Sequence, residues 1–352
     1  MKPNNLSPYP KSNSMSRRLV FITFPIILLV GIYFMGPEPY QPLWNMDMPV
    51  VPQDPEKLEV YVSEQEARHK LKPDNEARII WADSSKRKTE YSVVYIHGFS
   101  ASQEEGDPIH ERFAKAFGCN LYLARMSDHG VDTTEQLLYF TPDRWWKSSK
   151  EALAIGQALG EKVILMSTST GGTMSLILAA EYPNDVFALI NMSPNIAIND
   201  PAAWISNNPW GLQLARLVVG GNYNIPKVKP GVDAKLNNQY WNDKYRLEAV
   251  CQLEELLEDK MNRHTFEKVK QPCLTLYYFK NEQEQDPTVK VSAILEMNGQ
   301  LGTPDALKEA VPIPNGGGHV LGSYIVSKDI ETVSKEVRKF AIEKLGMKPV
   351  NE

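Results

Sequence analysis

The chain has 352 residues, of which 42% are hydrophobic and 23% charged, and its formal net charge is −5. This length predicts one large α/β domain with additional segments rather than one small domain. The acidic balance, with no run of five or more Lys and Arg residues, argues against a nucleic-acid-binding protein.

The cysteines of the chain follow no metal-binding spacing, and an odd number does not form a disulfide framework. They are Cys119, Cys251 and Cys273. We expect all three to be buried small hydrophobic side chains, with a single disulfide as the alternative.

An uncharged segment lies near the N-terminus, where residues 19–35 carry no charged side chain over 17 positions. As a helix it spans roughly 26 Å, close to the thickness of a bilayer core. The basic residues before it are Lys2, Lys11, Arg17 and Arg18, and the next one is Lys57. The positive-inside rule therefore predicts a single-pass transmembrane anchor with a cytoplasmic N-terminus and the rest of the chain on the extracytoplasmic side. A cleaved signal peptide is the alternative.

The chain is expected to divide into four parts. Residues 1–18 are predicted to form a polar cytoplasmic tail, residues 19–35 the anchor and residues 36–60 a Pro-rich tether. Residues 61–346 are predicted to form one globular domain. Within this domain, residues 195–270 contain several Pro, Gly and Trp residues and interrupt the regular pattern, so we expect an insertion there.

Apolar runs typical of buried strands alternate along the globular part with amphipathic segments typical of helices. This alternation predicts an α/β fold whose mostly parallel sheet has helices on both faces. The predicted strands are residues 91–96, 120–124, 163–166, 186–191, 273–279 and 310–313. The predicted helices are residues 55–70, 109–117, 142–159, 170–181, 245–260 and 329–345.

One predicted strand runs directly into a helix through Ser-Thr-Ser-Thr-Gly-Gly, with Ser169 at the third position. A nucleophilic serine on such a turn needs small residues two positions before and two positions after it, because the turn is tight. Ser167 and Gly171 meet this need for Ser169, whereas Ser167 has no glycine two residues later. The pattern therefore favours Ser169 as a nucleophile, and an ordinary helix cap is the alternative.

A second motif, His97-Gly98-Phe99, directly follows the predicted strand 91–96. Where a serine on a strand–helix turn is the nucleophile, a backbone N–H after a neighbouring strand forms half of the oxyanion hole, and the N–H after the nucleophile forms the other half. This predicts the amides of Phe99 and Thr170 as the pair. We expect His97 to have a structural role in the loop.

A general base is predicted at His319, which follows three glycines and precedes the last helix. Histidine titrates near neutrality, and a loop position allows it to reach a serine hydroxyl. The acid that orients it is sought after strand 273–279, where Asp286 precedes a proline and a predicted helix. We prefer Asp286, with Glu282 as the alternative.

The order Ser169, Asp286, His319 is the order of the α/β-hydrolase fold. From residue 89 to residue 345 the sequence resembles this superfamily, and most closely the lysophospholipase and monoacylglycerol-lipase-like serine hydrolases. A partial match to their Gly-His-Gly loop lies at Asp128-His129-Gly130, where we expect His129 to be structural. The resemblance implies a helical lid at about residues 195–270, ester hydrolysis through an acyl-enzyme, and no metal or organic cofactor.

The fold alone does not define the reaction. A membrane anchor and a Trp-containing lid favour a lipid-like carboxylic ester as the substrate. Other serine-dependent acyl chemistry, by a thioesterase, peptidase or acyltransferase, is the first alternative. A catalytically silent module that binds a partner is the second.

Overall fold

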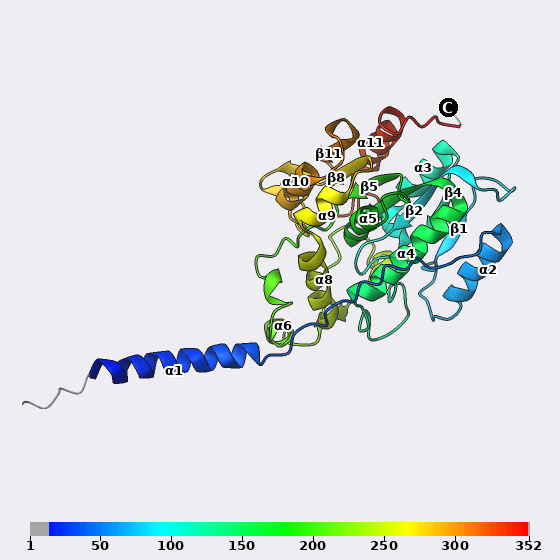
Figure 1. Cartoon of the computed structure of the whole chain (residues 1–352). Helices are drawn as coiled ribbons and strands as arrows, with labels where there is room; N and C mark the ends of the chain where they lie inside the picture. The colour runs from blue at the N-terminus through cyan, green and yellow to red at the C-terminus, as the bar shows by residue number, and fades with distance from the viewer. Residues whose placement is uncertain (1–13, 351–352) are drawn as a thin grey trace, which may run out of the picture.

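A seven-stranded sheet forms the centre of the computed structural model, which describes residues 14–350 (Figure 1). The strand order is β1-β3-β2-β4-β5-β8-β11, and all neighbours are parallel except β1 and β3. The strands are β1 (Arg78–Ile80), β2 (Thr89–Ile96), β3 (Asn120–Leu123), β4 (Gly160–Thr168), β5 (Ala188–Met192), β8 (Cys273–Tyr277) and β11 (Lys308–Pro312).

Helices cover both faces of this sheet. One face packs against α3 (Ile109–Phe117) and α11 (Ile330–Glu343). The other face packs against a larger group of helices, namely α2 (Pro55–Glu66), α4 (Pro142–Leu159), α5 (Thr170–Glu181), α9 (Arg263–Lys268) and α10 (Val291–Gln300).

The central strands are apolar on both sides because both faces are covered. In β2, Val93 and Tyr95 point to the α3 and α11 layer, while Val94 and Ile96 point to the opposite layer. All four side chains are fully buried. Side chains alternate along a strand, so a central parallel strand needs a continuous apolar run rather than an alternating one.

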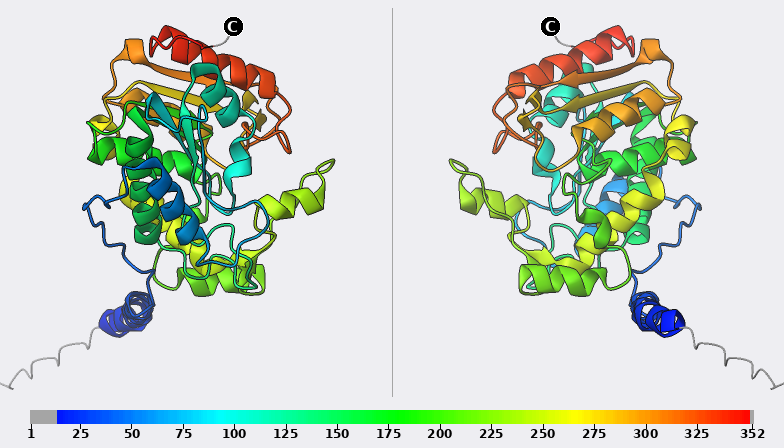
Figure 2. Two further views of the ribbon diagram at one scale, coloured as in Figure 1. Left: turned by 90° about the vertical axis from the view of Figure 1, so that its right-hand side faces the viewer. Right: turned by 90° about the vertical axis from the view of Figure 1, so that its left-hand side faces the viewer.

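A long insertion, residues 195–270, separates β5 from β8, and its part before α9 extends toward the end of the molecule away from α11 (Figure 2). Its elements before α9 are the 3₁₀ turn Ala203–Ile205, α6 (Gly211–Val219), β6 (Tyr223–Asn224), α7 (Ala234–Tyr240), β7 (Tyr245–Arg246) and α8 (Leu247–Lys260). Strands β6 and β7 form a separate two-stranded antiparallel sheet. Two short strands outside the insertion, β9 (Phe279–Asn281) and β10 (Glu284–Gln285), form a hairpin after β8.

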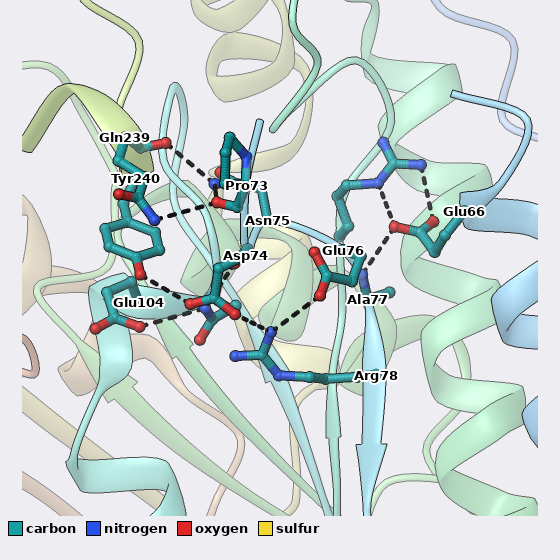
Figure 3. Close-up of polar contacts among 12 residues, drawn as sticks. Glu66, Pro73, Asp74, Asn75, Glu76, Ala77, Arg78, Glu104, Gln239 and Tyr240 are labelled. Carbon is teal, nitrogen blue, oxygen red and sulfur yellow. Dashed lines mark hydrogen bonds and ion pairs between the residues drawn. The ribbon is translucent and has the colours of Figure 1, made fainter. Parts of the chain in front are cut away.

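Polar contacts fasten α7 to the loop before β1 (Figure 3). The Tyr240 hydroxyl donates to Asp74 Oδ2 at 2.8 Å, and Arg78 Nη1 donates to Asp74 Oδ1 at 2.6 Å. Lys72 Nζ donates to the backbone oxygens of Asn238 and Trp241 at 3.0 and 3.1 Å. This loop therefore fixes the C-terminal end of α7 and the position of Trp241.

The predicted transmembrane anchor over residues 19–35 is wrong. Within residues 14–350, none of the helices combines the length and the apolar character that crossing a bilayer requires. Helix α1 covers Ser14–Phe34, so it begins in the Ser-Met-Ser-Arg-Arg segment, and its uncharged part is shorter than the roughly 20 residues that span a bilayer core. Three further predictions depended on the anchor and are not supported without it. They are the single-pass membrane location, the membrane contact through this helix, and the assignment of cytoplasmic and extracytoplasmic sides. Of the predicted polar tail, residues 1–13 lie outside the described part of the chain.

The segment after α1 is extended and packs along the body. The carbonyl of Asn45 accepts from Trp146 Nε1 and from Lys150 Nζ, both at 2.7 Å. The Tyr182 hydroxyl donates to Met46 O at 2.6 Å. The three cysteines are free and buried, as predicted, so the alternative of a disulfide does not apply.

Candidate active site

Ser169 occupies the turn between β4 and α5 with φ 55° and ψ −123°. A side chain other than glycine rarely adopts this conformation, which costs roughly 1–3 kcal/mol and persists only where surrounding contacts impose it. The Ser169 N–H donates to Met192 O at 3.0 Å, and its carbonyl accepts from the amides of Gly172 and Asn195 at 2.8 and 2.9 Å. These bonds hold the strained residue with its side chain at the C-terminal edge of the sheet.

Two glycines allow the close approach around this serine. A Cβ on Gly171 would lie 2.0 Å from Ile96 O, so only glycine fits between α5 and the end of β2. A Cβ on Gly98 would lie 2.8 Å from Ser169 Cβ. The loop after β2 and the turn after β4 are therefore in direct contact.

Ser167 has a different environment from Ser169. Its side chain is fully buried, and its hydroxyl donates to Asn191 Oδ1 at 2.8 Å on the neighbouring strand. Ser169 instead lines a cavity, and in residues 14–350 its hydroxyl makes no hydrogen bond. Ser169 is therefore the serine of this motif that is accessible to a ligand.

Phe99 and Thr170, whose backbone amides are predicted to form an oxyanion hole, share a cavity with Ser169. Both Phe99 and Thr170 line the same cavity, and within the described residues neither N–H has a hydrogen-bond partner. The loop that carries Phe99 is fixed by His97, whose Nδ1 contacts Gly98 O at 2.9 Å and whose Nε2 accepts from Met126 N at 3.0 Å. Burial holds the pKa of His97 well below its usual value. His97 is thus a structural residue, as expected.

His129 is structural as well. Its ring stacks on Trp145 at 5.1 Å, and its Nδ1 contacts Ser127 O at 2.8 Å. Burial lowers the pKa of His129 to about 4, so its imidazole is neutral at pH 7.

Asp286 and His319 form a close pair. Their Oδ2 and Nδ1 atoms are 2.8 Å apart, and the carboxylate is inaccessible to solvent. The other carboxylate oxygen, Oδ1, accepts from the amides of Thr288 and Val289 at 2.8 and 3.1 Å. Asp286 lies in this turn rather than at a helix N-terminus, because α10 begins only at Val291. Glu282, the alternative acid, is exposed in the hairpin between β9 and β10.

The surroundings of the pair shift the pKa values of Asp286 and His319 in opposite directions. Burial alone would raise the pKa of Asp286, but His319 and the two amides outweigh it, so the pKa lies below its usual value. Burial alone would lower the pKa of His319, but the charges of Asp286 and Glu105 and the Asp286 hydrogen bond hold it above its usual value. Only 12% of the His319 side chain is exposed, which is less than a glycine-rich loop predicts.

The cavity that Ser169 and His319 share has a volume of about 730 Å³. The insertion provides much of its lining, including Leu214 and Val218 of α6 and Leu253 of α8. No hydrogen bond joins Ser169 to His319 in the described part of the chain; catalytic contacts of this kind often tighten only when substrate binds.

A further residue of this cavity, Glu105, was not predicted from the sequence. It is 2% exposed, and its Oε2 accepts from Gly98 N at 2.6 Å. Burial raises its pKa to about 7, although Gly98, His319 and Trp241 each lower it. In sequence it is one of two adjacent glutamates in a polar loop, so no local pattern distinguishes it.

Solved structures of lipolytic enzymes are similar to this chain. A structure from the metagenome-derived lipolytic enzymes LipS and LipT matches with 17% identity and a TM-score of 0.61, over 77% of this chain and 98% of that one. The monoacylglycerol lipase of Paleococcus ferrophilus matches with 14% identity and a TM-score of 0.55, over 76% and 97%. A soluble variant of the monoglyceride lipase of Saccharomyces cerevisiae matches with 13% identity and a TM-score of 0.55, over 75% and 90%.

No protein-family model matches the sequence, and no curated protein is significantly similar to it. The similarity to solved structures nevertheless defines the architecture. The chain has the α/β-hydrolase fold, which confirms the fold class predicted from the sequence.

Proposed function

We propose that this protein is a serine hydrolase that cleaves a carboxylic ester through an acyl-enzyme on Ser169. One observation carries the proposal: the strained Ser169 after β4 and His319, which is hydrogen-bonded to Asp286, line the same cavity. The lipolytic enzymes with the same fold are consistent with this chemistry.

In the proposed reaction, His319 takes the proton of the Ser169 hydroxyl through Nε2, since its Nδ1 faces Asp286. Ser169 Oγ attacks the acyl carbonyl carbon, and the amides of Phe99 and Thr170 donate to the oxyanion that forms. His319 then protonates the leaving alcohol. Water repeats the cycle on the acyl-enzyme and releases the acid and Ser169.

The role of Asp286 follows from its burial and its pairing. Its carboxylate stabilises the imidazolium that forms when His319 takes a proton, and it holds the ring with Nε2 directed away from itself. The raised pKa of His319 makes it a stronger base in the ionised pair, while activity requires the imidazole to be neutral before the attack.

The cavity supports a substrate with a sizeable apolar part. Its wall from α6 and α8 presents aliphatic side chains, and its volume of about 730 Å³ exceeds the needs of an acetyl group. We therefore favour a lipid-like acyl ester, with residues 195–270 acting as a lid over the site.

Hydrolysis of p-nitrophenyl esters from acetate to dodecanoate tests this proposal. We expect kcat/KM to rise with chain length, and Ser169→Ala to lower kcat by about a thousandfold or more. Ser167→Ala is the matched control and retains activity, because this buried serine contacts Asn191 rather than the cavity. A strong preference for acetate contradicts the lipid-like substrate. Faster turnover of matched thioesters or anilides instead favours other serine-dependent acyl chemistry.

A further inference from the structure

Glu105 reaches the reaction site from a short 3₁₀ turn, Gln103–Gly106, that lies beyond the Gly98 loop. Its carboxylate is enclosed, and its Oε2 accepts from Gly98 N at 2.6 Å. No other residue in the described chain accepts a hydrogen bond from this amide. The side chain of Glu105 is therefore the partner that the buried Gly98 N–H needs.

The carboxylate and Ser169 lie around the same point. A Cβ on Gly98 would be 2.9 Å from Glu105 Oε2, 3.1 Å from Glu105 Oε1 and 2.8 Å from Ser169 Cβ. Glu105, Ser169 and His319 also line the same cavity. Glu105 is thus beside the proposed nucleophile.

Gly98 is held from both sides. The His97 ring contacts Gly98 O at 2.9 Å, and this oxygen belongs to the same peptide unit as the Phe99 N–H. The C=O and N–H of a planar trans peptide point in opposite directions, so fixing one directs the other. Glu105 fixes the preceding peptide unit through the Gly98 N–H. Together these contacts restrain both backbone dihedral angles of Gly98, and glycine is the residue type with the greatest conformational freedom.

We propose that Glu105 is a positioning residue of the active site, which holds the peptide units around Gly98 so that the Phe99 N–H faces the oxyanion formed at Ser169. This inference rests on the proposed serine hydrolase activity. Glu105 acts through the backbone of the loop, and its hydrogen-bond acceptor, rather than its charge, is the feature that positioning requires.

The charge of Glu105 has a separate effect on the pKa of His319, and this effect can be measured. The groups that face it are Gly98 N, His319 and Trp241, and burial raises its pKa to about 7. The charge of Glu105 also raises the pKa of the buried Tyr95, and the charge of Lys229 lowers the pKa of His319. Ionised Glu105 raises the pKa of His319, so its replacement by a neutral residue shifts that pKa downward.

Two substitutions separate the acceptor from the charge in the full-length protein. Glu105→Gln keeps an acceptor oxygen and removes the charge, whereas Glu105→Leu removes both at similar volume. Glu104→Gln and Glu104→Leu are matched controls, because Glu104 is the adjacent buried carboxyl and does not line the cavity. The readouts are kcat and KM for a p-nitrophenyl ester, the pH dependence of kcat/KM, and the melting temperature.

We expect Glu105→Leu to lower kcat by about a hundredfold or more, with KM changed less than about threefold, because an oxyanion donor acts mainly on the transition state. Glu105→Gln retains kcat within about tenfold, and its acid limb moves to lower pH by about half a unit. Both Glu104 variants match the wild type. Should Glu105→Leu not fold, Glu105→Asp replaces it, because the shorter side chain withdraws the acceptor from Gly98 and keeps the charge.

The inference is overturned if Glu105→Leu or Glu105→Asp folds with wild-type kcat, or if either raises KM alone. Equal losses in Glu105→Gln and Glu105→Leu, or an acid limb that Glu105→Gln leaves unmoved, overturn it as well. Failure of the proposed function is distinguished by the parent enzyme: it then hydrolyses no ester, or Ser169→Ala leaves the rate unchanged.

Discussion

Replacing Asp286 with asparagine tests the charge relationship at the centre of the site. The carboxylate is fully enclosed and the His319 side chain is only 12% exposed, so solvent screens the pair weakly. At an effective dielectric constant of about 20 and about 4 Å between charge centres, the attraction between carboxylate and imidazolium is about 4 kcal/mol. The imidazolium forms only as Ser169 attacks, so this energy is lost mainly from the transition state.

A loss of about 4 kcal/mol corresponds to about a thousandfold decrease in kcat. Asparagine also places either an amide oxygen or an NH₂ group opposite His319 Nδ1, and the NH₂ orientation favours the tautomer that cannot accept the serine proton. We therefore expect Asp286→Asn to lower kcat for a p-nitrophenyl ester by about 10³-fold to 10⁴-fold. The acid limb of the pH profile moves to lower pH, because the Asp286 charge raises the pKa of His319.

The matched control is Glu282→Gln, in the exposed hairpin that precedes Asp286. It is expected to retain wild-type kcat and the wild-type pH profile. Activity of Asp286→Asn within tenfold of the wild type refutes the reasoning, as does a comparable loss in Glu282→Gln.

Three further predictions concern the frame of the site. Gly171→Ala places a Cβ 2.0 Å from Ile96 O and should destabilise the fold by about 3 kcal/mol or more in chemical denaturation. The control is Gly299→Ala, whose Cβ meets nothing within 4 Å and which should be neutral or stabilising. Equal effects of the two substitutions contradict the packing argument. The folded-state pKa of Asp286 lies below its usual value, so its contribution to the unfolding free energy is present above about pH 4 and disappears as the pH falls through the folded-state pKa. Asp286→Asn should therefore flatten the dependence of the unfolding free energy on pH in this acid range. An unchanged pH dependence in this variant contradicts the prediction. Burial raises the pKa of each cysteine thiol to about 11 or 12. Iodoacetamide should therefore modify the cysteines of the native protein much more slowly than those of the unfolded protein. Rapid modification of the native protein contradicts the burial of the cysteines.

The alternation of strands and helices was predictable because each central element has a strong local pattern. Helices α3, α4 and α5 coincide with predicted segments, and β2 contains the predicted run 91–96. The insertion was predictable as an interruption, but its elements α6 and α7 were not, because they are short and their stability comes from tertiary contacts such as that between Tyr240 and Asp74.

Part of the candidate site has local signals as well. Ser169 and Gly171 stand out because a tight turn restricts the residue types around it, and the chain order of Asp286 and His319 matches the fold. Glu105 has no such signal: the sequence does not show which of two adjacent glutamates is directed at Gly98, and only the fold brings them together.

The membrane prediction rested on the 17 uncharged residues 19–35, which is the lower limit of the length that spans a bilayer core. Helix α1 begins five positions before this apolar run and ends at Phe34, one residue short of its end. The uncharged part of α1 is therefore residues 19–34, which falls just below that limit.

Covalent labelling of Ser169 is the most direct test of the account. A fluorophosphonate probe reacts with a serine only where a base and an oxyanion hole activate it. We predict that the wild-type protein is labelled at one site, that mass spectrometry places the adduct on Ser169, and that Ser169→Ala is not labelled while Ser167→Ala is. An unlabelled wild-type protein, or an adduct that persists in Ser169→Ala, contradicts the assignment of Ser169 as the nucleophile.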